Sequence, residues 1–381
     1  MYTDQVIIIG AGIAGLSLAI QLAENKKACI VLEERQFFDR ATSGVRISAQ
    51  GVRILEKMKI KNIGEHTERT IMYFGSIVTN FTLGNSAGNS PAIMVTRLAV
   101  HEQLMERAKL LGITVVTGFR VVAVNEYPGG VEATSEEGQC VTGRFLVGAD
   151  GVGSTIRKIL NPGQRSGKTY AGYLGVGLIT SCDEKIEMSL YQNPGDRVGV
   201  ASIGKINSND ANNNIFLWTH LYIPEGAAKA MTNEKVMEML VTRSQYWTPA
   251  LRKIFELFRA SPDLIIAHGP VYNGKIPSSW VSKNMILIGD AAHPYGPGGQ
   301  GISMALKDAE ELCSLLCNND PSEEKKTIFQ KVRSAEAKKF GESAEIRNKP
   351  EKQITSRWGI FFRGVIMKLY HFFNRGGLKY F

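Results

Sequence analysis

Short apolar runs alternate with amphipathic stretches through the first part of the chain. Residues 6–9 read VIII, a wholly apolar run that is typical of a parallel strand buried on both faces. Residues 13–25 follow as a predicted helix, and residues 29–33, CIVLE, follow as a second predicted strand. This strand–helix–strand order predicts an α/β fold that begins with a Rossmann-like unit.

The same pattern returns twice later in the chain. Residues 144–158, RFLVGADGVGSTIRK, predict an apolar strand followed by a short helix. Residues 283–290, KNMILIGD, predict another buried strand, and ISMALKDAEELCSLL from Ile302 predicts the helix after it. We therefore expect one α/β domain built from segments that are far apart in the sequence.

Apolar and polar side chains repeat with a different period in the stretch between these segments. Residues 185–206 and 213–224 alternate apolar and polar side chains around turn residues such as Asn193, which predicts strands. Residues 233–244 and 249–260 have the spacing of helices. We expect this stretch to form an antiparallel sheet inserted into the α/β domain.

Three glycines follow the first predicted strand in the spacing GxGxxG, at Gly10, Gly12 and Gly15. In this motif the first glycine permits a tight turn, the second lets a pyrophosphate approach, and the third lets the helix pack on the strand. The helix after the loop points its positive dipole end at the phosphates. Glu33 ends the second strand, where its carboxylate can accept hydrogen bonds from ribose hydroxyls and would repel a 2′-phosphate. The unit predicts a dinucleotide site.

The two later strands also end in aspartate and glycine. Asp150 and Gly151 follow one of them, and Gly289 and Asp290 end the other. An aspartate at the carboxyl end of a strand can accept a hydrogen bond from a ribose hydroxyl, while nearby N–H groups bind phosphate or carbonyl oxygens. Residues 289–301, GDAAHPYGPGGQG, contain so many glycines that we expect their main chain to touch a ligand.

These three motifs, in this order and spacing, resemble those of class A FAD-dependent aromatic monooxygenases with the p-hydroxybenzoate hydroxylase fold, over roughly residues 5–345. The resemblance implies that GxGxxG holds the ADP half of FAD, that Asp150 lies near the pyrophosphate, and that Asp290 binds ribitol and pyrophosphate. It also implies that the helix from Ile302 points its positive end at the flavin carbonyl near N1. The residues whose main chain would lie against the flavin ring are Pro297, Gly299, Gln300 and Gly301.

The resemblance also suggests roles for arginines and a histidine. Arg97 opens the helix in which relatives often place an FAD-binding arginine, with a capping or surface role as the alternative. Arg35 would lie along the adenine, and Arg46 falls in a segment that passes the flavin, although many relatives have no arginine there. His293 is interpreted as a structural histidine rather than a catalytic base. The predicted cofactor-binding residues are Gly10, Gly12, Ala14, Gly15, Glu33, Glu34, Arg35, Arg46, Arg97, Asp150, Gly151, Gly289, Asp290, Pro297, Gly299, Gln300, Gly301 and Ile302.

The implied function is a monooxygenase that uses NADPH or NADH to reduce FAD. A flavin C4a-hydroperoxide formed with molecular oxygen would then hydroxylate a small aromatic or polyketide-like substrate. No second GxGxxG occurs, which fits transient binding of the nicotinamide cofactor. No residue is assigned as a catalytic base, and the substrate stays open. The alternatives are FAD-dependent reduction or epoxidation of an isoprenoid-type substrate, and a non-catalytic regulatory flavoprotein.

The resemblance divides the chain into three parts. The FAD-binding domain is expected to be discontinuous, at residues 1–70, 96–168 and 269–345. The substrate domain is expected at residues 71–95 and 169–268, and a C-terminal amphipathic helix within residues 346–381.

Composition narrows the compartment and the partners. The chain has 381 residues, a formal net charge of +9, and five cysteines without CxxC or Cys/His spacing. We therefore expect a cytoplasmic protein without a metal site. The N-terminus lacks a basic region before its apolar run, so it predicts a strand and not a signal peptide. No nucleic-acid motif accompanies the basic charge, and no nucleic-acid partner is expected.

Much of the basic excess lies near the C-terminus, since residues 357–381 contain no acidic side chain. A helix is predicted from Pro350 to the Gly376–Gly377 pair. Two interpretations stand: its apolar stripe packs on the protein body and bridges the two domains, or it rests on the inner face of an anionic membrane. The predicted stripe consists of Trp358, Phe361, Phe362, Val365, Leu369, Phe372 and Phe373.

Overall fold

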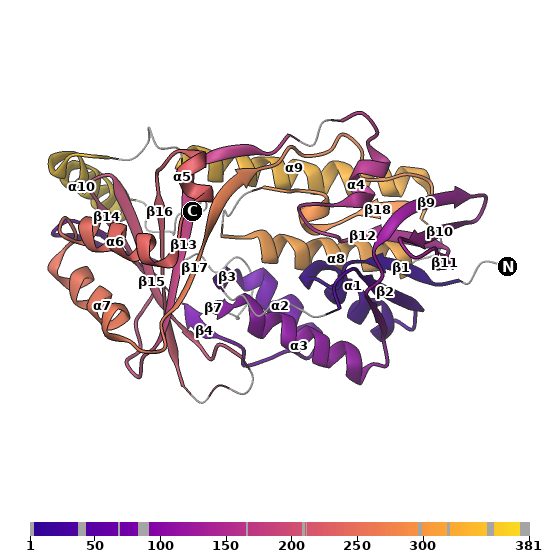
Figure 1. Cartoon of the computed structure of the whole chain (residues 1–381), viewed down its shortest axis with the longest axis horizontal. Coiled ribbons are helices and arrows are strands. Elements are labelled where there is room, and N and C mark those ends of the chain that lie inside the picture. The colour runs from indigo at the N-terminus through magenta and orange to yellow at the C-terminus, as the bar shows by residue number, and fades with distance from the viewer. Residues whose placement is uncertain are drawn as a thin grey trace.

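The computed structural model shows two parts side by side, one around a parallel sheet and one around a larger, mostly antiparallel sheet (Figure 1). The structure describes residues 4–36, 43–67, 69–82, 91–164, 167–207, 210, 212–295, 299–317, 321–348 and 354–373.

The parallel sheet has five strands in the order β18-β12-β1-β2-β8, and every neighbouring pair is parallel. This order confirms the predicted Rossmann-like unit and brings together segments far apart in the sequence. The strands are β1 (Val6–Ile9), β2 (Cys29–Glu33), β8 (Thr114–Thr117), β12 (Phe145–Gly148) and β18 (Met285–Leu287).

Both faces of this sheet are covered, which explains why β1 is apolar at every position. Ile8 packs in a cluster with α1 (Ile13–Glu24), α3 (Arg97–Leu110) and α8 (Gly301–Cys317). Ile7 points to the other face, where Val121 and Val131 of a three-stranded meander pack against it. The meander strands are β9 (Val121–Tyr127), β10 (Gly130–Ser135) and β11 (Cys140–Gly143).

The second sheet has seven strands in the order β17-β13-β16-β15-β14-β5-β6. All neighbours are antiparallel except β14 and β5, which are parallel. The strands predicted within residues 185–206 and 213–224 are confirmed, as are the helices at 233–244 and 249–260. The strands are β5 (Arg69–Phe74), β6 (Ile77–Thr82), β13 (Thr169–Ser181), β14 (Ser189–Asn193), β15 (Asp196–Gly204), β16 (Asn214–Leu221) and β17 (Ile265–Asn273).

Helices cover one face of the seven-stranded sheet. Leu217 of β16 packs with Leu240 and Phe255, which lie on α6 (Asn233–Ser244) and α7 (Pro249–Ala260). The opposite face turns toward the parallel-sheet part and carries the other residues of each strand, because side chains alternate along a strand. The short helix α5 (Glu225–Lys229) lies against β13 and β17.

A third, small sheet lies between the two parts. It has the order β3-β7-β4, with β3 (Gly44–Ile47), β7 (Ala92–Thr96) and β4 (Glu65–Thr67). The helix α2 (Ala49–Lys57) follows β3 and packs on α8. All of β7 except Thr96 lies in the range predicted for the substrate domain, whereas its partner β3 lies in the range predicted for the FAD-binding domain. The domain division itself stays a prediction.

The C-terminal helices differ from the predicted arrangement. The long α9 (Glu323–Asn348) packs on α8 and reaches the other part, where Asn348 Nδ2 donates to the Tyr173 hydroxyl at 3.3 Å. α9 therefore links the two parts, a role that one interpretation of the sequence gives to the last helix. That helix, α10 (Arg357–Phe373), packs on β5, β6 and β14 of the seven-stranded sheet. Pro350, its predicted start, lies outside the described residues, but residues 354–356 are described and are not helical, so the helix begins later than predicted.

The predicted apolar stripe of α10 is not the face that packs. Ile360 is 2% exposed and faces the sheet, whereas Trp358 and Phe362 are exposed. The prediction that the aromatic stripe packs on the protein body is therefore wrong for Trp358, Phe361, Phe362 and Leu369. The reason is steric: Gly364 lies so close to β5 that a Cβ there would be 2.7 Å from the Phe74 Cβ, so the side of the helix that carries this glycine is the one that can approach the sheet.

Candidate cofactor site

The predicted motifs meet at one edge of the parallel sheet. Neighbouring parallel strands end at the same edge, so the loops after β1, β2, β12 and β18 lie next to one another. Main-chain hydrogen bonds join them: Gly10 N donates to Leu32 O at 2.8 Å, Ala149 N to Ile9 O at 2.8 Å, and Ile288 N to Gly148 O at 3.0 Å. In an open α/β sheet this edge is where ligands bind.

The three glycines of the first loop have different surroundings. A Cβ on Gly10 would lie 2.5 Å from Ala149 O, and a Cβ on Gly15 would collide with Gly10 O. These two glycines are needed for packing within the protein. A Cβ on Gly12 would meet no atom within 4 Å, so open space adjoins its main chain at the start of α1. This is the division of tasks expected where a pyrophosphate approaches the second glycine.

Glu33 is buried at the end of β2 and holds two loops. Its Oε2 accepts a hydrogen bond from Ala11 N at 2.7 Å, and its Oε1 accepts from Arg35 N at 3.0 Å. The neighbouring side chains of Glu34 and Arg35 are exposed. Glu33 therefore joins the first phosphate loop to the segment after β2, at the position predicted for the ribose.

Arg97 is the first residue of α3 and is exposed. Thr96 caps the helix, because its hydroxyl accepts a hydrogen bond from Ala99 N at 3.1 Å, so Arg97 is not needed as a cap. One turn later, His101 Nε2 lies 2.8 Å from Ala11 O in the first phosphate loop. The start of α3 is thus held against this loop, and Arg97 stays available to a ligand there.

Asp150 and Arg157 connect the second and third motifs. The Asp150 carboxylate accepts hydrogen bonds from Ser154 Oγ at 2.5 Å and Thr155 N at 2.6 Å, at the start of α4 (Thr155–Leu160). Burial raises the pKa of Asp150, and these hydrogen bonds oppose the shift. The buried Arg157 donates to Asp290 O at 3.1 Å and Ala291 O at 2.9 Å. Asp150 therefore shapes its own loop, and Gly151 beside it faces open space.

The third motif forms a 3₁₀ turn over Gly289–Ala291 directly after β18. Gly289 has φ of 59°, a conformation that favours glycine, and a Cβ on it would lie 2.8 Å from the Ala14 Cβ. This packing brings the turn against the start of α1. Asp290 is exposed, and among the described residues its carboxylate has no hydrogen-bond partner. It is therefore free to accept hydrogen bonds from a ligand.

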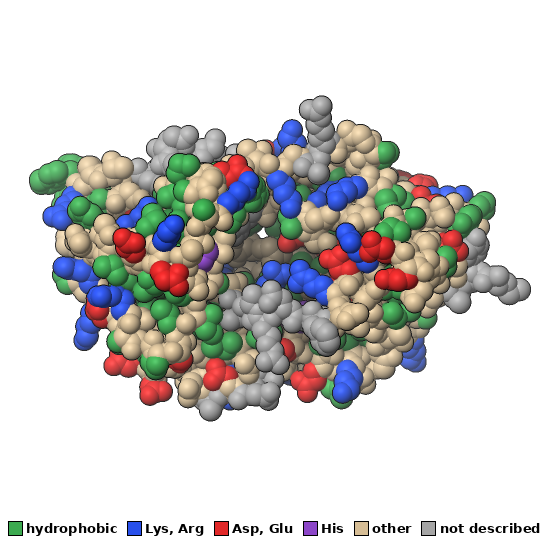
Figure 2. Space-filling view, in the orientation of Figure 1, with side chains coloured by type: hydrophobic (Ala, Val, Ile, Leu, Met, Phe, Trp, Pro, Cys, Tyr) green, Lys and Arg blue, Asp and Glu red, His purple; other side chains and the backbone are tan. Residues whose placement is uncertain are grey.

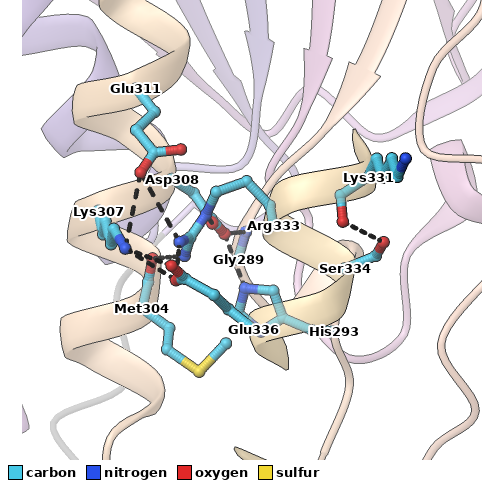
Figure 3. Close-up of polar contacts among 10 residues, drawn as sticks. All are labelled: Gly289, His293, Met304, Lys307, Asp308, Glu311, Lys331, Arg333, Ser334 and Glu336. Carbon is cyan, nitrogen blue, oxygen red and sulfur yellow. Dashed lines mark hydrogen bonds and ion pairs between the residues drawn. The ribbon is translucent and has the colours of Figure 1, made fainter. Parts of the chain in front are cut away.

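A buried polar cluster holds this turn from behind (Figure 3). Asp308 on α8 accepts hydrogen bonds from Gly289 N at 2.8 Å, His293 Nε2 at 2.7 Å and Arg333 Nε at 2.7 Å. Arg333 comes from α9 and also pairs with Glu336. We call Gly289, His293, Asp308 and Arg333 the clasp. It joins the turn, α8 and α9 at one carboxylate.

Charges within the clasp stabilise one another. Burial would raise the pKa of Asp308, but the charges of His293 and Arg333 outweigh it and hold the pKa below its usual range. Burial would lower the pKa of His293, but the Asp308 carboxylate raises it above its usual value. Because His293 is 3% exposed and bonded to protein, the structure places it as the predicted structural histidine.

The main chain before α8 is the segment predicted to lie against the flavin ring. Gly299 and Gly301 face open space, Gln300 O accepts a hydrogen bond from Met304 N at 3.0 Å, and Ile302 is half-buried in the first turn. The predicted Pro297 lies outside the described residues. Because α8 begins at Gly301, its positive dipole end points to the same edge as the phosphate loop.

Arg46 lies on β3, which contacts α8. Two residues further on, Ser48 N donates to Ser303 Oγ in the first turn of α8 at 2.9 Å. Within the described part of the chain, Arg46 Nε is buried and has no hydrogen-bond partner. A buried donor without a partner is costly, and a ligand that accepts its hydrogen bond would remove this cost.

An aromatic surface of the seven-stranded sheet faces this edge. Phe216 and Trp218 of β16 are stacked with ring centroids 5.3 Å apart, and Tyr173 of β13 is stacked on His220 at 4.1 Å. Burial, together with the charge of Arg197, lowers the pKa of His220 to about 4, so its ring is neutral at neutral pH. Figure 2 shows the face hollowed between the two parts of the molecule, with basic side chains at the rim of the hollow.

These features fit a bound dinucleotide. Open space adjoins Gly12, Gly151, Gly299 and Gly301 at one edge, and Arg46 offers an unpaired buried donor. Two helix N-termini, of α1 and α8, point to that edge. The donor set suits phosphates, ribose hydroxyls and the carbonyls of a flavin ring.

The residues that hold these loops in place are not among those predicted from the sequence. His101, Arg157, Asp308 and Arg333 belong to four different helices, and each contacts a predicted loop or its holder. Only His101 could have been found from the sequence, because it follows the predicted FAD-binding Arg97 by one helical turn. The others look like ordinary charged residues of amphipathic helices.

Comparisons with known proteins agree with this fold. A family model described as FAD binding domain matches residues 3–328. The chain is 27% identical to 3-hydroxybenzoate 6-hydroxylase 1 from Aquipseudomonas alcaligenes, covering 80% of this chain and 79% of that protein. It is 24% identical to the FAD-dependent urate hydroxylase from Mycolicibacterium vanbaalenii, covering 93% of this chain and 91% of that protein.

A solved structure shows the same architecture along nearly the whole chain. Klebsiella pneumoniae HpxO complexed with FAD and uric acid matches with a TM-score of 0.76 and 20% identity, covering 94% of this chain and 92% of that one. This likeness confirms the predicted combination of a Rossmann-like part with an antiparallel sheet.

Proposed function

Because the chain belongs to the FAD binding domain family, we propose that it is an FAD-dependent monooxygenase that hydroxylates a small aromatic or polyketide-like substrate. NADH or NADPH would serve as the reductant and molecular oxygen as the oxidant. The convergence of three glycine loops at one sheet edge, opposite an aromatic sheet surface, is the observation that carries this assignment.

Several of the predicted residues then have a task. The amides around Gly12 would bind the pyrophosphate, Glu33 the adenosine ribose, and Asp290 the ribitol. When bound there, FAD would supply hydride acceptance and oxygen activation. The main chain at Gly299–Gly301 and the α8 N-terminus would stabilise negative charge on the reduced ring, since a helix N-terminus favours anions. Arg46 and Arg97 would donate to FAD from the small-sheet side.

The substrate would lie between the FAD site and the aromatic surface of the seven-stranded sheet. The half-buried Trp218 would offer a flat face for stacking, and stacked or edge-to-face rings add attraction beyond the burial of area. Tyr173 is itself buried and stacks on His220. The relatives named above act on 3-hydroxybenzoate and urate, both small flat rings, which supports an aromatic substrate. Closing the ring between protein surfaces would also exclude water from the reacting atoms.

The purified protein is expected to carry FAD and not FMN. The sites around Gly12 and Glu33 would be left empty by FMN, which has no adenosine part. Flavin released by heat and identified by chromatography checks this expectation, and FMN as the released flavin would contradict it. A screen for small aromatics that accelerate NADH or NADPH oxidation then tests the activity. Oxidation that no aromatic stimulates would favour a regulatory flavoprotein.

Asp290→Ala is expected to weaken FAD binding by about tenfold or more. The substitution removes one or two hydrogen bonds to a charged acceptor, worth roughly 1.5–3 kcal/mol each. The fold should survive, because the Asp290 side chain is exposed and Arg157 binds only its main-chain oxygen. FAD titration of the apoprotein measures the change, with Asp183→Ala as a control at an exposed acid in another loop. Equal affinities in the two variants would place this loop away from the cofactor.

A further inference from the structure

We propose that α10 docks the protein on an anionic membrane surface, a property separate from the proposed reaction. The helix presents an apolar face that no part of the described structure covers. We call this face the docking face; its residues and exposed fractions are Trp358 73%, Phe361 40%, Phe362 59%, Ile366 64% and Leu369 51%. Contiguous exposed apolar surface of this kind marks an interaction site, because water contact with it is unfavourable.

The docking face is held outward by the other side of the helix. Ile360 is 2% exposed and Gly364 is buried against β5 and β6. The segment before the helix is also fixed, because Gly195 N donates to Ile354 O at 2.8 Å. Turning the docking face inward would expose Ile360 and push bulky side chains against Phe74. The aromatic rings instead pack on one another, with Trp358 and Phe361 centroids 6.2 Å apart.

Charge identifies the partner. Arg357, Arg363 and Lys368 lie on α10, and no Asp or Glu occurs from residue 352 to the C-terminus. An aromatic face flanked by basic side chains is the pattern of helices that lie in the interface of an anionic bilayer. Figure 2 shows apolar and basic side chains next to one another at the end of the molecule where α10 lies in Figure 1. Among the described residues, no helix is long and apolar enough to span a membrane, so contact through α10 would be peripheral.

A second copy of the chain fits this face less well. An isologous dimer through α10 would bring two identical basic helices together, because the same patch meets itself in such an interface. Like charges in contact repel, whereas anionic headgroups attract all of them. The membrane is therefore the partner that satisfies both the apolar face and its charges.

Vesicle flotation with the full-length, FAD-loaded protein tests the proposal. We expect the protein to bind phosphatidylcholine vesicles that contain phosphatidylglycerol. Binding should weaken when phosphatidylglycerol is left out, and it should also weaken at high salt. The double variant Trp358→Ser/Phe362→Ser should lose about tenfold or more in partitioning, because it removes two interfacial aromatic anchors. The control is Leu110→Ser/Tyr246→Ser. It changes two apolar side chains that are 74% and 61% exposed, one at the end of α3 and one after α6. This variant should bind the vesicles like the unchanged protein.

Three further measurements separate the outcomes. Lipids with brominated chains should quench the fluorescence of the unchanged protein more than that of Trp358→Phe, since Trp358 would enter the bilayer. Retained FAD binding in every variant shows that the fold is intact. Absence of flotation with anionic vesicles overturns the proposal. So does a dimer in light scattering that the Trp358→Ser/Phe362→Ser variant loses, which would make a second copy the partner.

Discussion

Asp308→Ala is expected to lower the free energy of unfolding by about 3–5 kcal/mol, because it removes the one fully buried carboxylate among the described partners of the buried Arg333. Arg333 is 0% exposed and its Nε donates to Asp308 at 2.7 Å, while Gly289 N and His293 bind the same carboxylate. Removing the carboxylate leaves three buried donors unpaired at once. Chemical denaturation of the FAD-loaded protein measures the change.

Glu310→Ala is the matched control on the same helix. Glu310 pairs with Lys57 at 2.6 Å, but both side chains are partly or largely exposed, and such a pair contributes at most about 1 kcal/mol. The two variants therefore separate a buried charge cluster from a surface ion pair. Similar small losses in both would mean that the clasp is not a stabilising centre.

The clasp also predicts how stability changes with pH. The folded pKa of His293 is raised, so its contribution is fully present below its usual value of 6.5 and is lost as pH rises through the folded pKa. The folded pKa of Asp308 is lowered, so its contribution is present above its usual value of 3.8 and is lost as pH falls through the folded pKa. His293→Gln should therefore flatten the loss of stability on the alkaline side in denaturation curves measured across pH. It should also weaken the acid-side dependence without removing it, because Arg333 still holds the pKa of Asp308 down.

The parallel sheet and its loops could be predicted because their signals are local. The run at residues 6–9, the glycine spacing after it and Glu33 at the end of the next strand all lie within one βαβ unit. Parallel pairing then brings distant loops to one edge without further information. The alternating residues of β14, β15 and β16 were predictable for the same reason.

The clasp could not be predicted, because burial of a charged residue is a tertiary property. Asp308 and Arg333 are 25 residues apart and meet only because α8 and α9 pack together. In the sequence both sit among other charges on helices, where a solvated face is the ordinary interpretation. The face of α10 that packs was missed for a related reason. Hydrophobic periodicity found the most aromatic side, whereas the shape of the sheet beneath selects the side that carries Gly364.

Gly12→Val is expected to weaken FAD binding strongly while the protein still folds. A Cβ at this position meets nothing within 4 Å, and the residue has φ of −76° and ψ of −177°, an extended conformation open to valine. Unfolding free energy should therefore change by no more than about 1 kcal/mol, the usual effect of a poorer helix cap. FAD affinity should fall by about 100-fold or more, because the side chain fills the space that the pyrophosphate needs against the main chain.

Gly15→Val and Gly226→Val are the control variants for the effect of Gly12→Val on FAD binding. A Cβ on Gly15 collides with Gly10 O, so this variant should lose stability as well as FAD. Gly226 lies on α5 in the other part of the molecule and has open space around it, so its variant should bind FAD normally. FAD titration and thermal unfolding of the three apoproteins separate loss of fold from loss of the site. A folded Gly12→Val protein with unchanged FAD affinity would show that the pyrophosphate does not bind at this loop.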